Sequence, residues 1–186
     1  MGQIHILPLL EIKAETRAQL LEAIEQQVQW PAAIEALEFD PRFAYDQIRG
    51  QYHSSQILLG LHSKLNRPQD KIIAIVPFDL YIPILTYVFG EAQLDGPAAV
   101  VSLFRLRPEF YGLPPVPARV VERLIKESIH ELGHTFGLRH CPQPECVLHA
   151  STYVEEIDLK SHTFCPDCSA LLQAAQAKRR TAAPAG

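Results

Sequence analysis

Hydrophobic residues along the first two thirds of the chain follow two different periods. Short apolar runs at residues 4–10, 71–78 and 98–106 are typical of β-strands. The run 71–78 is apolar almost throughout, which is the pattern of a central strand covered on both faces. Between these runs, apolar residues recur every three or four positions, as they do in helices. We therefore predict an α/β (α+β) fold in which helices pack on a sheet.

Two helices are predicted in the N-terminal half. In the first, Thr16 and Gln19 have the spacing of a capping box, followed by an apolar face. In the second, Ser54 or Ser55 is expected to cap the first turn, and the helix should end at residues 66–68, where a proline follows. Residues 32–50 between them fit either a strand or a packed loop.

The pattern in the second half predicts a hairpin, a loop and a long helix. A short turn between residues 87–94 and 98–106 predicts an antiparallel hairpin. The proline-rich residues 108–117 are expected to form a stiff surface connector, and Pro117 can open the helix that follows. Gly137 is expected to end that helix. The face of this helix that carries an apolar stripe is expected to pack on the core: Val121, Ile125, Ile129, Leu132 and Phe136.

The long helix carries the motif HExxH at residues 130–134. Residues four apart lie on one face of a helix, so His130 and His134 can bind one Zn²⁺ together. Glu131 follows the first ligand and need not be a ligand itself. Because a bound Zn²⁺ lowers the pKa of its water to about 7, a carboxylate beside that water can act as a general base. The motif therefore predicts hydrolytic chemistry with Glu131 as the base.

A third histidine extends the motif to HExxHxxGxxH. On an unbroken helix, His140 would lie about 15 Å beyond His130 and could not reach the same ion. A bend at Gly137 removes this difficulty, so the glycine and the third histidine are coupled requirements. Three neutral imidazoles leave one coordination position open, which is the arrangement of a catalytic zinc site.

All four cysteines of the chain lie close behind this motif. They form two pairs, Cys141 with Cys146 and Cys165 with Cys168, separated by eighteen residues. Four converging thiolates make a closed zinc site with a structural role. Two disulfides or four free thiols are the alternative, and a reducing compartment disfavours the disulfides. His149 and His162 could contact either site or substrate, but ordinary surface residues are the simpler interpretation.

Composition narrows the class of protein. The chain has 186 residues, of which 47% are hydrophobic, and a formal net charge of −4. Mild acidity argues against a nucleic-acid binder or an anionic-membrane binder, because both need clustered Lys and Arg. No signal peptide, prosegment or apolar run of transmembrane length is apparent. We expect a monomeric, cytoplasmic protein whose partner is a peptide or protein substrate.

The two motifs together resemble the archaemetzincins, a branch of the metzincin zinc peptidases. The resemblance rests on HExxHxxGxxH followed by Cys141, Cys146 and the pair Cys165 and Cys168, and it extends over most of residues 71–186. It implies a twisted mixed sheet with one antiparallel edge strand above a cleft and an active-site helix below. It also implies two parts of one catalytic domain, residues 1–137 and residues 138–186.

The resemblance also implies the role of each matching residue. His130, His134 and His140 would bind a catalytic zinc, with Glu131 as general base. The four cysteines would bind a second, structural zinc, giving two Zn²⁺ per chain. One position departs from the family pattern: a methionine is expected in a turn below the catalytic metal, and Leu148 stands there, Met1 being the only methionine. Leu for Met nearly conserves volume, so we expect the turn to form.

Three functions remain open at this point. Hydrolysis of peptide bonds is the first, and the resemblance implies it. A zinc-stabilised peptide-binding pseudoenzyme is the second, motivated by Leu148. Zinc-dependent hydrolysis of a non-peptide amide is the third. No second oxyanion donor can be assigned: Tyr153 lies after the turn, but a packing role is the simpler expectation for it.

Overall fold

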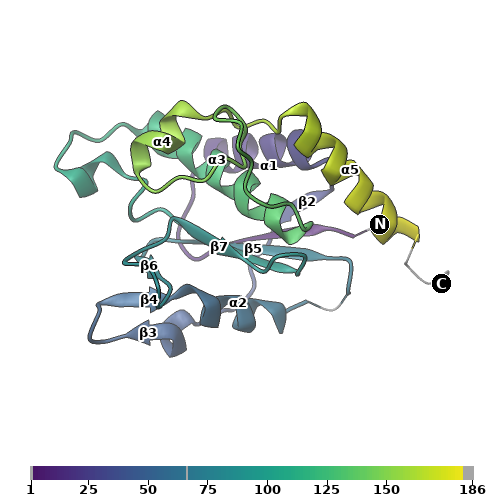
Figure 1. Cartoon of the computed structure of the whole chain (residues 1–186). Helices are drawn as coiled ribbons and strands as arrows, with labels where there is room; N and C mark the ends of the chain where they lie inside the picture. Colours follow the sequence, from purple (N-terminus) through teal and green to yellow (C-terminus); the bar gives the residue numbers. More distant parts are fainter. Residues whose placement is uncertain (1, 66, 182–186) are drawn as a thin grey trace.

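A five-stranded mixed sheet lies at the centre of the molecule (Figure 1). The structure is a computed structural model and describes residues 2–65 and 67–181. The strands run in the order β2 (Ala32–Ile34), β1 (Ile4–Pro8), β5 (Lys71–Val76), β8 (Ala98–Ser102) and β7 (Gly90–Ala92). Only β7 is antiparallel to its neighbour. The mixed sheet with one antiparallel edge strand and the central position of β5, all of whose residues are buried, are thus confirmed.

The predicted hairpin is formed by β7 and β8. Gly90 pairs with Val101 and Ala92 with Ala99. Both strands are shorter than the sequence pattern indicated. Strand β7 begins late because the segment before it leaves the main sheet, where Val88 forms an isolated bridge with Leu80. The segment before β7 therefore continues beyond the edge of the main sheet.

Helices cover the sheet unequally. The helices α1 (Ala14–Val28), α3 (Pro117–Thr135), α4 (Val154–Leu159) and α5 (Pro166–Thr181) lie on one side, and α2 (Ser54–His62) lies on the other (Figure 1). Beside α2 is a small second sheet, which the sequence pattern did not predict: β3 (Tyr45–Asp46), β4 (Gln51–His53) and β6 (Leu80–Tyr81). The larger apolar core lies on the α1 and α3 side and continues into residues 138–172.

Both predicted helix caps are wrong. The helix α1 begins at Ala14, with Lys13 in the cap position and no side-chain cap, so Thr16 already lies in the first turn. The helix α2 also begins without a side-chain cap. The hydroxyls of Ser54 and Ser55 instead donate to the carboxylate of Glu91 on β7. This tertiary acceptor is what the local pattern could not reveal.

The end of α2 also differs from the prediction. The helix α2 stops at His62, before residues 66–68, of which Asn66 lies outside the described residues. The last helix, α5, extends to Thr181, and the chain after it lies outside the described residues. None of the described helices is long and apolar enough to cross a membrane.

The apolar stripe of α3 is core only in its second half. Ile129, Leu132 and Phe136 are at most 2% exposed. Val121 and Ile125 are only half-buried and line a surface groove between α3 and α1. The C-terminal turns of α3 lie deeper because the sheet covers one side and residues 138–172 cover the other. This depth is what places the HExxH segment in the interior.

Candidate active site and metal centre

The HExxH segment forms the C-terminal turns of α3. His130 and His134 project from the same side, with ring centroids 4.7 Å apart and their Nε2 atoms 3.1 Å apart. Each Nδ1 lies within hydrogen-bond distance of a backbone carbonyl, that of Val147 at 2.8 Å and that of Leu138 at 2.7 Å. When each Nδ1 donates to its carbonyl, Nε2 carries the lone pair that a metal ion needs.

Gly137 brings the third histidine to the other two. Its φ of +91° is in the left-handed region, where glycine meets no steric penalty. The helix therefore stops, and the ring of His140 returns to 5.3 Å from that of His130 and 4.9 Å from that of His134. The coupling between the glycine and the third histidine, inferred from the sequence, is present in the structure.

The three imidazoles fit one zinc ion. Their candidate ligand atoms all lie within 4.8 Å of one another, and tetrahedral zinc with bonds of about 2.0 to 2.1 Å needs nitrogen atoms about 3.3 Å apart. Burial lowers the pKa of His130, His134 and His140, which favours the neutral form that binds metal. His130 is buried and His140 exposed, so the cluster opens on one side.

Glu131 lies beneath the edge strand. Its side chain is buried, and its Oε2 has no hydrogen-bond partner within the described part of the chain. Strand β7 passes so close that a Cβ on Gly90 would lie 2.7 Å from Oε1 of Glu131. Burial, and after it the charge of Glu127, raises the pKa of Glu131 well above its usual range. Gly90 is therefore needed to leave room for this carboxylate, and no sequence motif predicted this requirement.

A buried ion pair lies behind the histidines. Nζ of Lys160, from the end of α4, is 2.9 Å from Oε1 of Glu127, one turn before His130 on α3. The side chains are 0% and 4% exposed. The same Nζ donates to the carbonyl of His149 at 3.2 Å and lies 3.4 Å from Nδ1 of His130. The pair thus ties α3 to the segment between the two cysteine pairs, and no pattern in the sequence predicted it.

The four cysteines converge as their spacing predicted. All are free thiols; Cys141, Cys146 and Cys168 are buried and Cys165 is half-buried. Their sulfur atoms lie within 4.8 Å of one another, and those of Cys141 and Cys165 are 3.8 Å apart. That distance excludes a disulfide, which needs about 2.05 Å, and equals the edge of a ZnS₄ tetrahedron with bonds of about 2.3 Å.

The electrostatics of the cysteine cluster also favour a cation. Burial raises the pKa of Cys146 and of Cys168, while the backbone N–H of Cys168 lowers that of Cys165. Four thiolates in this position would repel one another, and a coordinated cation deprotonates its thiols and balances their charge. The donor set therefore fits a closed tetrahedral zinc site.

Leu148 packs against α3 at Gly133, the residue before His134. It is fully buried, and its Cδ2 lies so close to α3 that a Cβ on Gly133 would be 2.8 Å away. The surrounding turn is held by backbone bonds, since the N–H of Cys141 donates to the carbonyl of Leu148 and that of His149 to the carbonyl of Cys146. A backbone turn therefore forms around Leu148.

The remaining residues singled out from the sequence belong to neither cluster of candidate ligands. Nδ1 of His149 lies 3.1 Å from the carbonyl of Cys141, so this histidine supports the loop backbone. His162 is exposed. Tyr153 is 63% exposed, so the expectation that it packs is wrong, because its neighbours in the loop leave it on the surface.

A cavity of about 250 Å³ opens beside the histidines. Residues 85–90, here called the strand wall, line one part of it, and residues 150–152, here called the loop wall, line another. Between them lie the side chains of His130, Glu131, His140 and Glu127. This cavity brings the candidate base and two of the three histidines to the same space.

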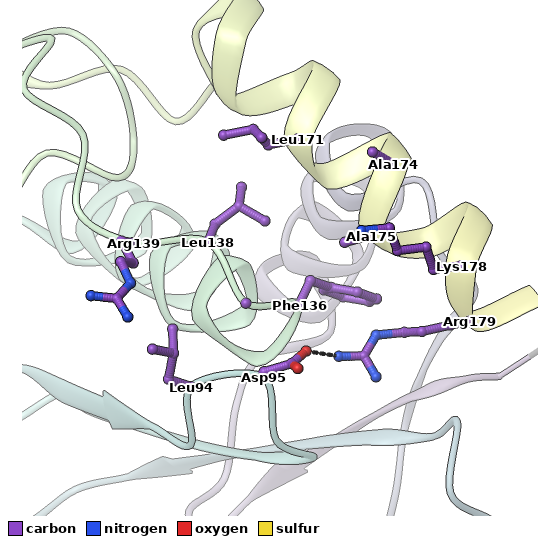
Figure 2. Close-up of a pocket in the computed structure, with 11 residues that line it drawn as sticks. Leu94, Asp95, Phe136, Leu138, Arg139, Leu171, Ala174, Ala175, Lys178 and Arg179 are labelled. Atoms are coloured by element: carbon purple, nitrogen blue, oxygen red, sulfur yellow. Dashed lines mark hydrogen bonds and ion pairs between the residues drawn. The ribbon is translucent and has the colours of Figure 1, made fainter. Parts of the chain in front are cut away.

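A larger hollow of about 800 Å³ lies on the other side of the Gly137 turn (Figure 2). It is bounded by α5 and the β7–β8 turn, where Arg179 and Asp95 form an ion pair. None of the three clustered histidines and none of the cysteines lines it. Size alone would therefore favour this hollow, whereas the candidate metal ligands favour the smaller cavity beside Glu131 as the candidate site.

Comparisons with known proteins agree with this geometry. Residues 14–174 match the sequence model of peptidase family M54. The chain is 43% identical to the archaemetzincin of Methanocaldococcus jannaschii over 133 residues, 72% of each chain. It is 36% identical to that of Pyrococcus furiosus over 173 residues, 89% of each chain.

Solved structures give the same result. The archaemetzincin of Methanopyrus kandleri superposes with a TM-score of 0.79 at 33% identity, covering 95% of this chain and 96% of that one. A zinc-dependent peptidase from Methanocorpusculum labreanum superposes with a TM-score of 0.83 at 28% identity, covering 91% and 99%. The chain therefore belongs to the archaemetzincins, peptidase family M54, and is a zinc-dependent metallopeptidase.

Proposed function

We propose that the histidine cluster is the catalytic centre, that Glu131 is its general base, and that the cysteine cluster holds a second, structural zinc. The observation that carries this proposal is the convergence of three imidazoles beside a buried carboxylate with an unpartnered oxygen. His130, His134 and His140 would hold the catalytic ion, and Cys141, Cys146, Cys165 and Cys168 the structural one. The chain would thus bind two Zn²⁺.

The proposed reaction is hydrolysis of a peptide bond. A bound zinc ion would polarise the scissile carbonyl and lower the pKa of an attacking water. Glu131 would take the proton from that water and deliver it to the leaving amine. Gly90 leaves the space for Glu131, and the carbonyl of Val147 fixes the ring of His130. A buried base with a raised pKa suits proton transfer near neutral pH.

The finer assignments are part of the same proposal. We propose a metzincin-type peptidase in which Leu148 replaces the methionine of the turn, acting on peptides as a cytoplasmic monomer, with no nucleic-acid or membrane partner. Four thiols that must stay reduced to bind zinc favour a reducing compartment. We also propose that Gly137 divides the catalytic domain into residues 1–137 and 138–186. A pseudoenzyme has no support, since the turn around Leu148 is intact.

The test replaces the base and keeps the metal. We expect Glu131→Gln to retain both zinc ions and to lower peptide hydrolysis by about 10²- to 10⁴-fold, the usual contribution of a general base. Glu122→Gln is the matched control, because Glu122 is on the same helix but its side chain is 61% exposed. Zinc content and kcat/KM on a peptide library are the measurements. Equal hydrolysis by both variants would remove Glu131 from the mechanism.

A further inference from the structure

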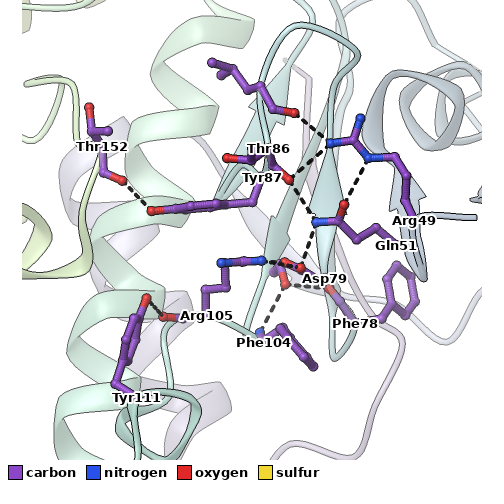
Figure 3. A network of polar contacts seen from close by, with 12 residues as sticks. Arg49, Gln51, Phe78, Asp79, Thr86, Tyr87, Phe104, Arg105, Tyr111 and Thr152 are labelled. Carbon is purple, nitrogen blue, oxygen red and sulfur yellow. Dashed lines mark hydrogen bonds and ion pairs between the residues drawn. The ribbon is translucent and has the colours of Figure 1, made fainter.

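A network of hydrogen bonds and ion pairs holds the backbone of the strand wall (Figure 3). Nε2 of Gln51 donates to the carbonyl of Thr86 at 3.0 Å and to Asp79 at 2.8 Å. Nη2 of Arg49 donates to the carbonyl of Leu85 at 3.2 Å. The backbone before Tyr87 is therefore held by Gln51 of the small sheet and by Arg49 of the β3–β4 turn, while Asp79 of the β5–β6 connection orients the side chain of Gln51.

The ring of Tyr87 is fixed in direction by its neighbours. The guanidinium of Arg105 lies 4.0 Å from the ring centroid. Its Nε and Nη2 donate to the two carboxylate oxygens of Asp79, each at 2.7 Å. The ring of Phe89 stands edge to face at 5.5 Å. A cation over one face and an aromatic edge beside the ring restrict its rotation.

The hydroxyl of Tyr87 reaches the opposite side of the cavity. It donates to the carbonyl of Thr152 at 2.7 Å, across 65 positions of sequence (Figure 3). Thr152 is held in turn, because Glu156 accepts hydrogen bonds from the backbone N–H groups of Thr152 and Tyr153. One hydrogen bond between two anchored segments thus joins the strand wall to the loop wall. We call this bond the crossbar.

The crossbar lies in the path of an extended substrate. Within the described part of the chain, the outer edge of β7 pairs with no other strand of its sheet. A peptide can add to such an edge by main-chain hydrogen bonds. A peptide laid there over Glu131 and continued along the strand wall would have to pass between the strand wall and the loop wall at Tyr87. A substrate that ends before this point leaves the crossbar intact, whereas a longer one must break it and turn the ring aside.

From this geometry we propose that Tyr87 is a specificity-determining residue: its bond to Thr152 closes one end of the cleft and makes the enzyme prefer substrates that are short on that flank. The inference rests on the proposed function, since it assumes that the cavity beside Glu131 receives the peptide. It concerns how far the substrate extends and leaves the chemistry at the scissile bond unchanged.

The test uses two peptide series with constant residues around the cleaved bond. One series is lengthened one residue at a time on the N-terminal flank, the other on the C-terminal flank. For the zinc-loaded enzyme, kcat/KM should fall by roughly 3- to 10-fold once one flank passes the crossbar, the effect of losing one net hydrogen bond. The ratio of long to short substrates should rise in Tyr87→Phe and rise further in Tyr87→Ala.

Tyr111→Phe is the matched control. Its hydroxyl donates to the carbonyl of Arg105 at 3.0 Å, and it does not line the cavity, so the control should keep the wild-type ratio. An unchanged ratio in both Tyr87 variants would overturn the proposal.

A binding measurement separates this proposal from the catalytic one. The same peptides are titrated against zinc-loaded Glu131→Gln, with and without Tyr87→Phe. If the wild type cleaves no peptide, the proposed function fails, yet the affinities still decide the crossbar. A length limit on one flank that Tyr87→Phe relieves supports the crossbar, and affinities that do not change with Tyr87→Phe contradict it.

Discussion

The histidine cluster and the cysteine cluster are joined by two adjacent residues, His140 and Cys141, but their surroundings differ. The histidine cluster offers three ligands, opens through the exposed His140, and borders a cavity that holds a carboxylate. The cysteine cluster offers four ligands, three of them buried. Three protein ligands beside a cavity leave one coordination position of a zinc ion open for water or substrate, whereas four protein ligands leave none. The same kind of ion can therefore serve reaction at one site and stability at the other.

The segment around the cysteine cluster explains why the proposed structural ion would be needed there. Between α3 and α5, residues 138–165 contain only the short helix α4. Few backbone groups are paired in regular structure, so cross-links of another kind must hold the loops. The histidines, by contrast, stand mostly on a long helix that the sheet already supports.

The largest expected effect comes from breaking the cysteine cluster. Cys146→Ser should release one of two zinc ions and lower the free energy of unfolding by about 5 kcal/mol or more, since structural zinc supplies about 10 to 16 kcal/mol in small domains. Zinc analysis and urea unfolding measure both. His162→Ala, at an exposed position of the same loop, should change neither. Retention of two zinc ions with unchanged stability would refute the structural assignment.

The next effect tests the ion pair that links the two regions. Lys160→Met should cost about 3 to 5 kcal/mol of stability, because it leaves the buried carboxylate of Glu127 without its partner. The double variant Lys160→Met with Glu127→Gln should recover part of this loss. Arg42→Met, which breaks the exposed pair with Asp40, should have no measurable effect on unfolding. Equal stability of Lys160→Met and the wild type would contradict this account.

A pH-dependent effect is expected at the C-terminal end of α3. Nζ of Lys71 donates to the carbonyls of Gly96 and Thr135, and burial lowers the pKa of Lys71 to about 7. At pH values between about 7 and the ordinary pKa of 10.5, Lys71 binds more protons in the unfolded chain than in the folded one. Stability from this group therefore rises with pH, by at most about 1.4 kcal/mol per unit.

Lys71→Met isolates this contribution. Unfolding of wild type and variant is compared at pH 7.5, 8.5 and 9.5, with zinc and reductant held constant. The difference between the two proteins removes the titration of the cysteines, which both contain. The wild type should gain stability relative to the variant as pH rises, and parallel pH profiles would show that Lys71 is not perturbed.

The smallest effect is expected at Leu148. Restoring methionine changes volume little, so Leu148→Met should alter stability by less than about 1.5 kcal/mol and kcat/KM by less than about tenfold. Both zinc ions should remain. Calorimetry and hydrolysis of a short peptide are the measurements. A large gain in activity would mean that leucine impairs the catalytic site, and the comparison between the two regions would then need revision.

Local patterns in the sequence predicted the two clusters well. Helical periodicity places His130 and His134 on one face, and only a bend at Gly137 can bring His140 to them. These arguments need no knowledge of distant residues. The cysteine pairs converge for a similar reason, because four thiols at short spacings have one common arrangement that satisfies them all.

Features that depend on packing between distant segments could not be predicted. Gly90 is required because β7 passes over Glu131, and the pair of Glu127 with Lys160 joins residues on different helices. The serine caps failed for the same reason: Ser54 binds Glu91 across the fold, and a local rule cannot weigh that partner. The small sheet was missed because its strands have only two or three residues.

Stepwise removal of metal tests the division of roles most directly. The protein is titrated with a graded chelator while bound zinc, peptide hydrolysis and unfolding temperature are followed in the same samples. Because the open site has three ligands and the closed site four thiolates, the first zinc should leave from the histidines. Hydrolysis should then vanish with the fold intact, and loss of the second zinc should unfold the chain. Simultaneous loss of activity and fold with the first zinc would contradict the account.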